Sequence, residues 1–212
     1  MILNPGIYAF YKPKGISSYD LIRKIKKITP KNKIGHSGTL DPLASGVLVV
    51  AIGRQFTKRL SLINKESKEY IAQIYLGVKS STDDEAGEKT KVKIKIQPDL
   101  KTIKNCLKNF IGEIYQTPPL FSAVKIKGKP AYWYARQKLK INLKPKKVII
   151  YDIKILKYNW PILKIKVNCS SGTYIRSLAR DIGQTLGCGA YLKDLIRTKV
   201  DGFTLKDCIK LN

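Results

Sequence analysis

Residues 35–46 combine reactive side chains with the composition of a rigid loop. They hold three glycines and one proline within twelve residues and run directly into the apolar stretch 47–52. Asp41 precedes Pro42, and the proline ring disfavours helical dihedrals at the residue before it, so we expect Asp41 to be extended. A carboxylate in such a loop either caps a turn or does chemistry as a nucleophile or base, and this segment alone favours the cap.

Metal chemistry has little support in the sequence. His36 is the only histidine, which excludes a site with several histidine ligands. The four cysteines, Cys106, Cys169, Cys188 and Cys208, match neither a metal knuckle nor a dense disulfide framework, so we expect reduced, mostly buried thiols. No glycine-rich nucleotide-binding motif is present. We therefore predict an activity that needs no metal and no cofactor.

Residues 125–147 form a second candidate site, of a different kind. Lysines and arginine alternate there with Tyr132, Trp133 and Tyr134. Cations for phosphates and planar rings for bases are the groups that bind single-stranded or loop RNA. The alternative is that the three rings form the core stripe of a short helix, and the sequence does not decide between the two.

Composition limits the class of protein and of partner. The chain has 212 residues, 43% of them hydrophobic, so it can bury a core and is not disordered. It carries 41 Lys and Arg against 15 Asp and Glu, a net charge of +26, which attracts polyanions such as nucleic acid, anionic membranes or acidic proteins. No apolar run could span a bilayer and the N-terminus lacks a signal sequence. We expect a soluble, cytoplasmic protein.

Apolar residues recur at helical spacing in three segments. Ser17 and Asp20 form a capping box that begins a helix ending near residues 29–30. A second helix is predicted over 100–111, and a third over about 173–186, with a glycine after each. These helices must lie against strands, because the rest of the apolar pattern has the period of a sheet.

Four strands are predicted from that pattern. The run 47–52 is continuous and fully buried, whereas 70–78 alternates, with Tyr70 on the apolar face. Residues 148–156 form another strand. In 163–169 apolar residues alternate with polar ones, which predicts a strand with one buried face and one solvent-exposed, basic face. Helices and strands do not alternate regularly, so the fold class is α+β.

Five motifs follow one another along nearly the whole chain. They are YKPKGISS (11–18), GHSGTLDPLASGVLVVAIG (35–53), KEYIAQIYLG (68–77), QTPPLFSAVKIKGKPAYWYARQ (116–137) and CSSGTYIRSLARDIGQTLGCGAYLKDLIRT (169–198). Together they resemble the TruB family of tRNA pseudouridine synthases. The resemblance implies the pseudouridine synthase catalytic fold, a mixed, mainly antiparallel sheet with flanking helices and a basic inserted loop.

The resemblance also implies a function and catalytic residues. The family isomerises the uridine at position 55, in the tRNA T loop, to pseudouridine, after flipping the base out of the loop. Its catalytic aspartate aligns with Asp41, and the arginine that pairs with this aspartate aligns with Arg176. The base-stacking tyrosine aligns with Tyr70, and two further pocket residues align with Tyr174 and Leu195. An ionised carboxylate beside a guanidinium suits this chemistry.

Other residues are implied as substrate contacts. His36 aligns with a histidine that enters the T loop, Lys12 belongs to the KPxGxxS motif, and Asp84 aligns with the later aspartate of a TDTxDxxG motif. The earlier aspartate of that motif is replaced by Ser81, which affects loop contacts with flipped bases.

We expect one catalytic domain, residues 1–212, with a basic RNA-binding insertion at about 125–147 and no C-terminal PUA-like domain. The expected partner is the T arm of tRNA, with no membrane and no obligate protein partner, and the protein is expected to be a monomer. Alternatives are a non-catalytic RNA-binding protein on the same scaffold and a different RNA target. Whether the aspartate attacks the base, attacks the sugar or deprotonates it stays open.

Overall fold

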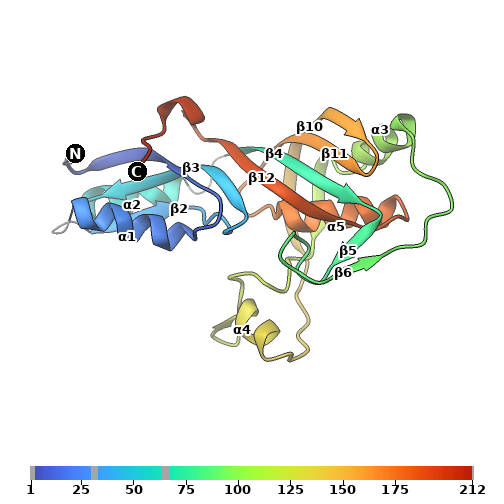
Figure 1. Ribbon diagram of the computed structural model, residues 1–212. Helices are drawn as coiled ribbons and strands as arrows, with labels where there is room; N and C mark the ends of the chain where they lie inside the picture. Colours follow the sequence, from blue (N-terminus) through green and yellow to red (C-terminus); the bar gives the residue numbers. More distant parts are fainter. Residues whose placement is uncertain (1–2, 30–32, 64–66, 212) are drawn as a thin grey trace. The chain divides into compact units, whose positions relative to one another are not determined.

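The computed structural model describes residues 3–29, 33–63 and 67–211, and these fall into two compact units (Figure 1). Unit 1 contains the described residues of Met1–Ile71, Val167–Ser171 and Leu195–Asn212. Unit 2 contains Ala72–Lys166 and Gly172–Asp194. The prediction of a single domain stays a prediction.

Unit 1 is built around one central strand. Its complete elements are β1 (Gly6–Lys12), α1 (Ser18–Ile28), β2 (Ile34–Ser37), β3 (Ala44–Ile52), α2 (Arg54–Ile63), β13 (Phe203–Thr204) and the 3-10 helix η1 (Leu205–Asp207). Strand β3 pairs antiparallel with β1 and β2 and parallel with the C-terminal part of β12 (Ala190–Val200). Strands β4 (Lys68–Leu76) and β11 (Ile162–Cys169) contribute one end each to this unit.

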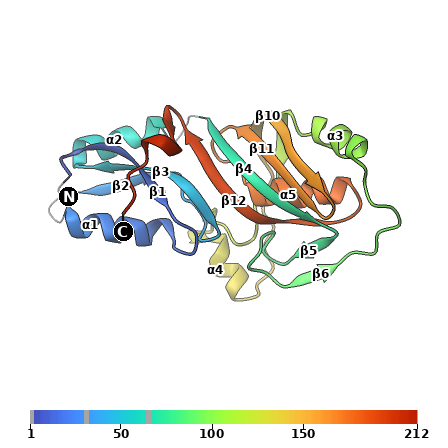
Figure 2. The same ribbon diagram turned by 45° about the horizontal axis from the view of Figure 1, so that its top comes forward.

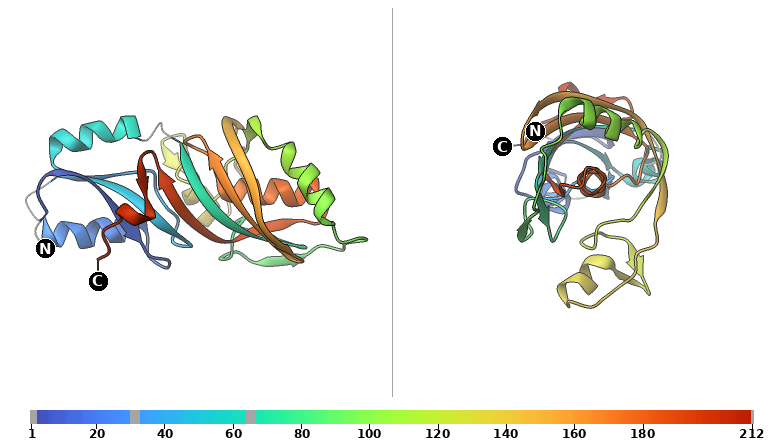
Figure 3. Two further views of the ribbon diagram at one scale, coloured as in Figure 1. Left: turned by 90° about the horizontal axis from the view of Figure 1, so that it is seen from above. Right: turned by 90° about the vertical axis from the view of Figure 1, so that its right-hand side faces the viewer.

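Strand β3 is buried on both faces because a helix covers each one (Figure 3). Val47, Val49 and Ala51 pack with Leu60 and Ile63 of α2. The intervening residues pack against α1; this second cluster comprises Phe10, Leu21, Ile22, Ile25, Leu48, Val50 and Ile52. The predicted fully buried strand is therefore confirmed, although it begins earlier, at Ala44.

Helix α1 forms as its sequence predicts. Ser17 caps the helix by accepting from the backbone nitrogen of Asp20, and the Asp20 carboxylate accepts from the backbone nitrogen of Ser17. Such a cap stabilises a helix by about 1 kcal/mol. Thr29 is the C-cap, whereas Pro30, predicted near the end of this helix, lies outside the described residues.

Unit 2 contains a strand layer, two longer helices and the basic insertion. Its complete elements are β5 (Val78–Ser80), β6 (Lys89–Lys91), α3 (Leu100–Lys108), β7 (Gly112–Gln116), β8 (Lys125–Ile126), β9 (Lys129–Pro130), α4 (Ala131–Arg136), β10 (Lys146–Asn159) and α5 (Ile175–Thr185). The strand order within the unit is β12-β4-β11-β10-β7. The right-hand view of Figure 3 shows α5 end-on beneath the curve of β10 and β11. The α+β prediction is confirmed.

Two predicted elements end earlier than expected, and in each case a glycine with positive φ stands where the chain enters the next strand. The second predicted helix ends at Lys108 rather than Ile111, and Gly112, at φ 99°, begins β7. The strand predicted over 70–78 ends at Leu76, because Gly77 has φ 87° and turns the chain into β5. Glycine adopts such dihedrals without the steric cost of a Cβ.

The remaining predicted elements are confirmed with shifted ends. Strand β10 extends beyond the predicted 148–156, β11 alternates as expected, and α5 begins at Ile175 and is followed by Gly187 at φ 69°. All four cysteines are free thiols; three are buried and Cys208 is partly buried. Helix α2 and the strands β1, β2 and β12 were not predicted.

Residues 125–147 form an arm between β7 and β10. It contains the short β8–β9 hairpin and the single-turn helix α4, and Figures 1 and 2 show it in yellow, projecting from unit 2. We refer to it as the basic arm.

Candidate active site

The loop that carries Asp41 is fixed to two neighbouring segments. The Ser18 hydroxyl donates to the Leu40 carbonyl oxygen at 3.0 Å, and its oxygen accepts from the Leu40 backbone nitrogen at 2.8 Å. On the other side of Asp41, the carbonyl oxygen of Pro42 accepts from the backbone nitrogen of Gly15 at 2.8 Å. Asp41 itself is partly exposed. Its backbone is therefore held on both sides, while its side chain stays accessible.

Arg197 of β12 is a second anchor of this loop, and it is not among the site residues predicted from the sequence. Its side chain is almost fully buried; Nη2 donates to the Gly38 carbonyl oxygen at 2.9 Å, and Nε donates to the Val47 carbonyl oxygen at 2.8 Å. A single arginine thus bridges the glycine-rich loop and the strand after it. The one signal in the sequence is a basic residue near the end of the last motif, residues 169–198.

Lys12, at the end of β1, lies inside the protein close to Asp41. Its Nζ donates to the carbonyl oxygens of Pro13 at 2.9 Å and Ile16 at 2.7 Å. Burial lowers the pKa of Lys12 to about 8, and the positive charge of Arg197 also lowers it, whereas the Asp41 carboxylate acts in the opposite direction. Lys12 therefore shapes the turn after β1 and contributes positive charge near Asp41.

Tyr70 of β4 is buried in the same unit as Asp41 and Arg197. Burial raises the pKa of its phenol; the Asp41 carboxylate raises this pKa too, while the charge of Arg197 and a hydrogen bond with it lower the pKa. Leu195 is also buried and pairs with Ala44, three residues after Asp41. Unit 1 therefore brings together Lys12, Asp41, Tyr70, Leu195 and the unexpected Arg197.

His36 lies on β2, opposite Val50 of β3. Its Nδ1 is buried and has no hydrogen-bond partner among the described residues. Burial lowers the pKa of His36, and the positive charge of Arg197 lowers it further. The imidazole is therefore neutral at neutral pH.

Arg176, in the first turn of α5, is buried in unit 2. Its Nη2 donates to the Phe121 carbonyl oxygen at 2.9 Å and its Nη1 to the Thr82 carbonyl oxygen at 3.4 Å. Nη1 also lies 3.6 Å from Oδ2 of Asp84, which is buried as well. The structure thus brings together Arg176 and Asp84, two of the predicted residues. The predicted pairing of Arg176 with Asp41 stays a prediction.

Asp84 is held by the turn that surrounds it. Its Oδ1 accepts from the Thr82 hydroxyl and, at 3.0 Å, from the backbone nitrogen of Ala86. Ser81, the departure from the family motif, closes the same turn: its hydroxyl accepts from the Glu88 backbone nitrogen at 3.0 Å. Ser81 therefore has a structural role that needs no carboxylate.

Tyr174 precedes α5 and is its N-cap residue, with φ −95° and ψ 108°. Its backbone nitrogen donates to Oε1 of Gln116 at 2.7 Å. Tyr174, Arg176 and Asp84 are the predicted site residues of unit 2.

The aromatic rings of the basic arm do not form a buried stripe. Tyr132 is 41% exposed and Trp133 and Tyr134 are half-buried, while Ala131 is the residue of α4 that is buried. The ammonium of Lys129 lies 3.7 Å from the centroid of the Trp133 ring, an attractive cation–π contact. The alternative of a core helix stripe is therefore wrong.

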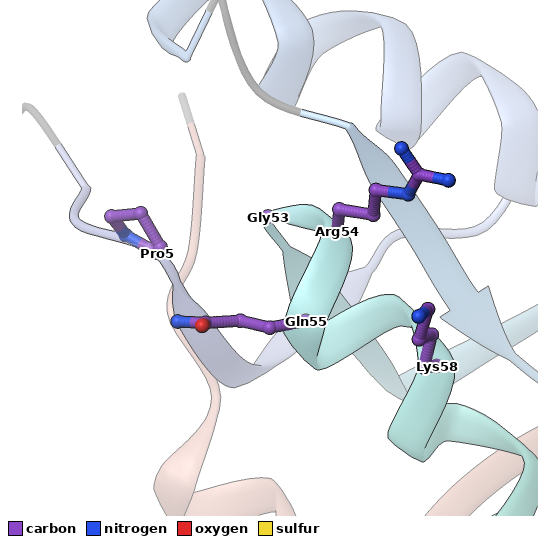
Figure 4. A pocket seen from close by; sticks show the side chains of 5 residues that line it. All are labelled: Pro5, Gly53, Arg54, Gln55 and Lys58. Carbon is purple, nitrogen blue, oxygen red and sulfur yellow. The ribbon is translucent and has the colours of Figure 1, made fainter.

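Two pockets lie among residues that were not predicted as site residues. A pocket of about 460 Å³ in unit 1 is lined by Pro5, Gly53, Arg54, Gln55 and Lys58. Figure 4 shows Gln55 extending toward Pro5, while Arg54 and Lys58 extend away from it, so the charged groups do not converge. A pocket of about 320 Å³ in unit 2 is lined by Lys79, Ser80, Asp83, Arg180, Gln184, Gly189 and Ala190.

The described part of the chain contains no cluster of three or more side chains suited to hold a metal ion. Within the same residues, no helix is long and apolar enough to cross a membrane.

Two structures of known proteins share this fold. A Cbf5-Nop10-Gar1 complex contains a chain that matches with a TM-score of 0.76 and 32% identity over 97% of this chain. A chain of an H/ACA RNP bound to a substrate RNA containing 2′-deoxyuridine matches with a TM-score of 0.71 and 29% identity, again over 97%. This chain spans about half the length of those two chains, 52% and 50%.

This chain matches a larger share of the length of its curated relatives than of those two structures. The tRNA pseudouridine synthase B of Clostridium tetani (strain Massachusetts / E88) is 44% identical over 97% of this chain and 71% of its own. That of Chlamydia muridarum (strain MoPn / Nigg) is 44% identical over 98% of this chain and 85% of its own. Family models match as well: TruB family pseudouridylate synthase (N terminal domain) at residues 12–175, and tRNA pseudouridylate synthase B C-terminal domain at 176–212. The chain belongs to the TruB family of pseudouridylate synthases.

Proposed function

We propose that this chain converts the uridine at position 55, in the T loop of tRNA, into pseudouridine. Membership of the TruB family makes it an isomerase that forms pseudouridine, and the curated relatives named above support tRNA as the substrate. The position within the T loop and the roles of individual residues are the parts that we propose.

The reaction exchanges one bond of the nucleoside for another. The N1–C1′ bond breaks, the uracil turns, and a C5–C1′ bond forms; the hydrogen on C5 is lost as a proton and N1 gains one. Atoms and electrons balance without an oxidant or a second substrate. The protein therefore needs a group that activates the glycosidic bond and a pocket that keeps the detached base.

One observation carries the proposal: Asp41 stands on a loop fixed at both sides, in the same unit as a buried tyrosine and two buried cations, Lys12 and Arg197. Positive charges favour the ionised form of a nearby carboxylate, and this form can add covalently or abstract a proton. A fixed backbone also holds the carboxylate in one orientation, which lowers the entropy cost of reaching the transition state.

The family resemblance assigns a further role to Arg176, which lies in unit 2. Arg176 presents a planar guanidinium whose two terminal nitrogens each donate to a carbonyl oxygen, and its Nη1 also lies 3.6 Å from Oδ2 of Asp84. Such a guanidinium suits the orientation of a second carboxylate, and we assign this role toward Asp41 during catalysis. Within unit 2, Asp84 helps to hold the guanidinium in place.

A uridine inside a folded loop must leave its stack before it can react, at a cost of a few kcal/mol. From the family resemblance we assign stacking on the flipped uracil to the Tyr70 ring, and further contacts with the base to Tyr174 and Leu195. His36 is neutral, so it can enter an RNA loop as a flat ring without carrying a charge into the stack. Lys12 contributes through its charge, and the basic arm supplies further contacts with the RNA.

The test replaces Asp41 with asparagine, which is nearly isosteric but neutral. The variant loses both the nucleophile and the base while its RNA-binding surface is unchanged, so we expect turnover to vanish and tRNA affinity to persist. Release of tritium from tRNA labelled at C5 of uridine measures turnover, and filter binding measures affinity.

The matched control is Asp201→Asn, a carboxylate on an exposed turn of the same unit. It should retain wild-type turnover. Appreciable tritium release by Asp41→Asn would show that Asp41 is not the catalytic carboxylate. Wild-type protein that binds T-arm RNA but releases no tritium would instead support a non-catalytic RNA-binding protein.

A further inference from the structure

Gln116, the last residue of β7, is a buried polar residue that the proposed reaction leaves unexplained. Its side chain is 1% exposed, and its Oε1 accepts from the Tyr174 backbone nitrogen at 2.7 Å. Its Nε2 is buried and has no hydrogen-bond partner among the described residues. The oxygen is therefore the atom through which Gln116 acts on its surroundings.

The bond from Tyr174 to Gln116 lies at the start of α5, where a helix has backbone N–H groups without partners inside the helix. The start of α5 lacks the usual local support. The Tyr174 side chain makes no capping hydrogen bond, and no acidic residue lies in the first turn. Gln116, 58 residues earlier in the chain, supplies an acceptor there instead.

Residues just after Gln116 hold the same helix turn. The Ser177 hydroxyl donates to the Thr117 carbonyl oxygen at 2.8 Å, and Arg176 Nη2 donates to the Phe121 carbonyl oxygen at 2.9 Å. Gln116 is also the last residue of β7, where it pairs with Lys146 of β10. The register of these two strands therefore sets where the Gln116 oxygen lies, and this oxygen sets where α5 begins.

We propose that Gln116 is a positioning residue that fixes Tyr174 and Arg176 relative to the rest of unit 2. The inference rests on the proposed function, in which Tyr174 and Arg176 line the uridine pocket. Without the Gln116 acceptor, the backbone of Tyr174 can rotate away from its present dihedrals and carry both side chains with it. Gln116 itself does not contact the RNA.

The test compares two substitutions of Gln116. Gln116→Met keeps the length and removes the acceptor. Gln116→Glu keeps an oxygen in reach of Tyr174 in either protonation state and replaces the amide nitrogen by a second carboxyl oxygen. For Gln116→Met we expect kcat to fall by about tenfold or more, because a displacement of about 1 Å in a positioning group can cost on the order of 100-fold. The Kd for tRNA should stay within about twofold of the wild-type value, since no RNA contact is removed. Gln116→Glu should restore kcat.

The matched control is Asp99→Ala. Asp99 caps α3 of the same unit, and its Oδ1 accepts from the Thr102 backbone nitrogen at 2.7 Å. Its loss should lower Tm without lowering kcat. If Gln116→Met does not fold, Gln116→Asn replaces it, because asparagine keeps the amide but is too short to reach Tyr174.

Four outcomes overturn the proposal. Gln116→Met could keep the wild-type kcat, or Gln116→Glu could lose as much kcat as Gln116→Met. Asp99→Ala could lose as much kcat as Gln116→Met, or a rise in the Kd for tRNA could account for the whole loss of activity in Gln116→Met. Failure of the proposed function looks different. In that case the wild-type protein releases no tritium, or Asp41→Asn retains turnover, whatever the Gln116 variants do.

Discussion

Arg176 occupies a position that is unfavourable for a cation. It lies in the first turn of α5, where the partial positive charge of the helix terminus repels a guanidinium, and it is buried as well. The carbonyl oxygens of Phe121 and Thr82 and the carboxylate of Asp84 offset that cost. Removal of the guanidinium would leave the buried Asp84 carboxylate without its cation, so Arg176 and Asp84 depend on each other at this position.

Arg176→Lys separates charge from shape. Lysine keeps the positive charge but has one nitrogen instead of a planar fork, so it cannot hold Phe121 and Asp84 and still orient a second carboxylate. We expect kcat to fall by about 100-fold, the size of effect seen when a positioned electrostatic group is lost, with little change in the tRNA Kd. Single-turnover kinetics and filter binding measure the two quantities. The reverse pattern would make Arg176 a phosphate contact.

At the scale of elements, the loop of Asp41 depends on how closely β3 and β12 approach. Gly46 of β3 pairs with Arg197 of β12, and a Cβ at Gly46 would lie 2.2 Å from the Arg197 carbonyl oxygen. Gly46 also has φ 111°. Any larger residue would force the strands apart and move Arg197, which holds Gly38 and Val47.

Gly46→Ala is therefore expected to be much more destabilising than an alanine placed at another glycine with positive φ. Gly112, at φ 99°, has nothing within 4 Å of its Cβ position, so Gly112→Ala measures the backbone strain alone, about 1–2 kcal/mol. Gly46→Ala should cost that strain plus about 1–3 kcal/mol for the displaced backbone. Urea unfolding of both variants measures the difference. Equal losses would show that β3 and β12 separate without cost.

At the scale of the whole molecule, the dominant property is the net charge of +26. The lysines are spread along the chain, and those of the basic arm at 125, 127, 129, 138 and 140 are exposed. A positive field of this extent steers RNA toward the protein without reading its sequence. Specificity must then come from the pocket and from the shape of the RNA loop.

Binding should therefore depend steeply on salt. Each phosphate neutralised contributes about 0.7–0.9 to the slope of log affinity against log salt concentration, so several contacts give a steep fall. We expect a T-arm stem-loop and whole tRNA to show parallel slopes and to be modified with similar efficiency. Titrations of both RNAs across a salt series measure this. A strong preference for whole tRNA would mean that the protein uses contacts beyond the T arm.

The amino-acid sequence by itself determined the elements whose cause is local. The capping box of α1, the alternation of β11 and the apolar run of β3 each depend on residues within a few positions of one another, so their spacing predicts them. The motifs likewise indicated the family and the loop that carries Asp41. The helix end at Lys108 was missed because the apolar spacing continues to Phe110, two residues beyond the last helical residue.

The tertiary structure alone decided which distant residues meet. Arg197 binds Gly38, 159 positions away, and Gln116 binds Tyr174, 58 positions away. Neither pair has a periodic or local signal, because each hydrogen bond depends on the register of strands that pair only after the chain has folded. A buried arginine or glutamine looks in the sequence like any polar residue near a strand end. Its role becomes visible only when folding removes water and leaves a specific backbone atom as its partner.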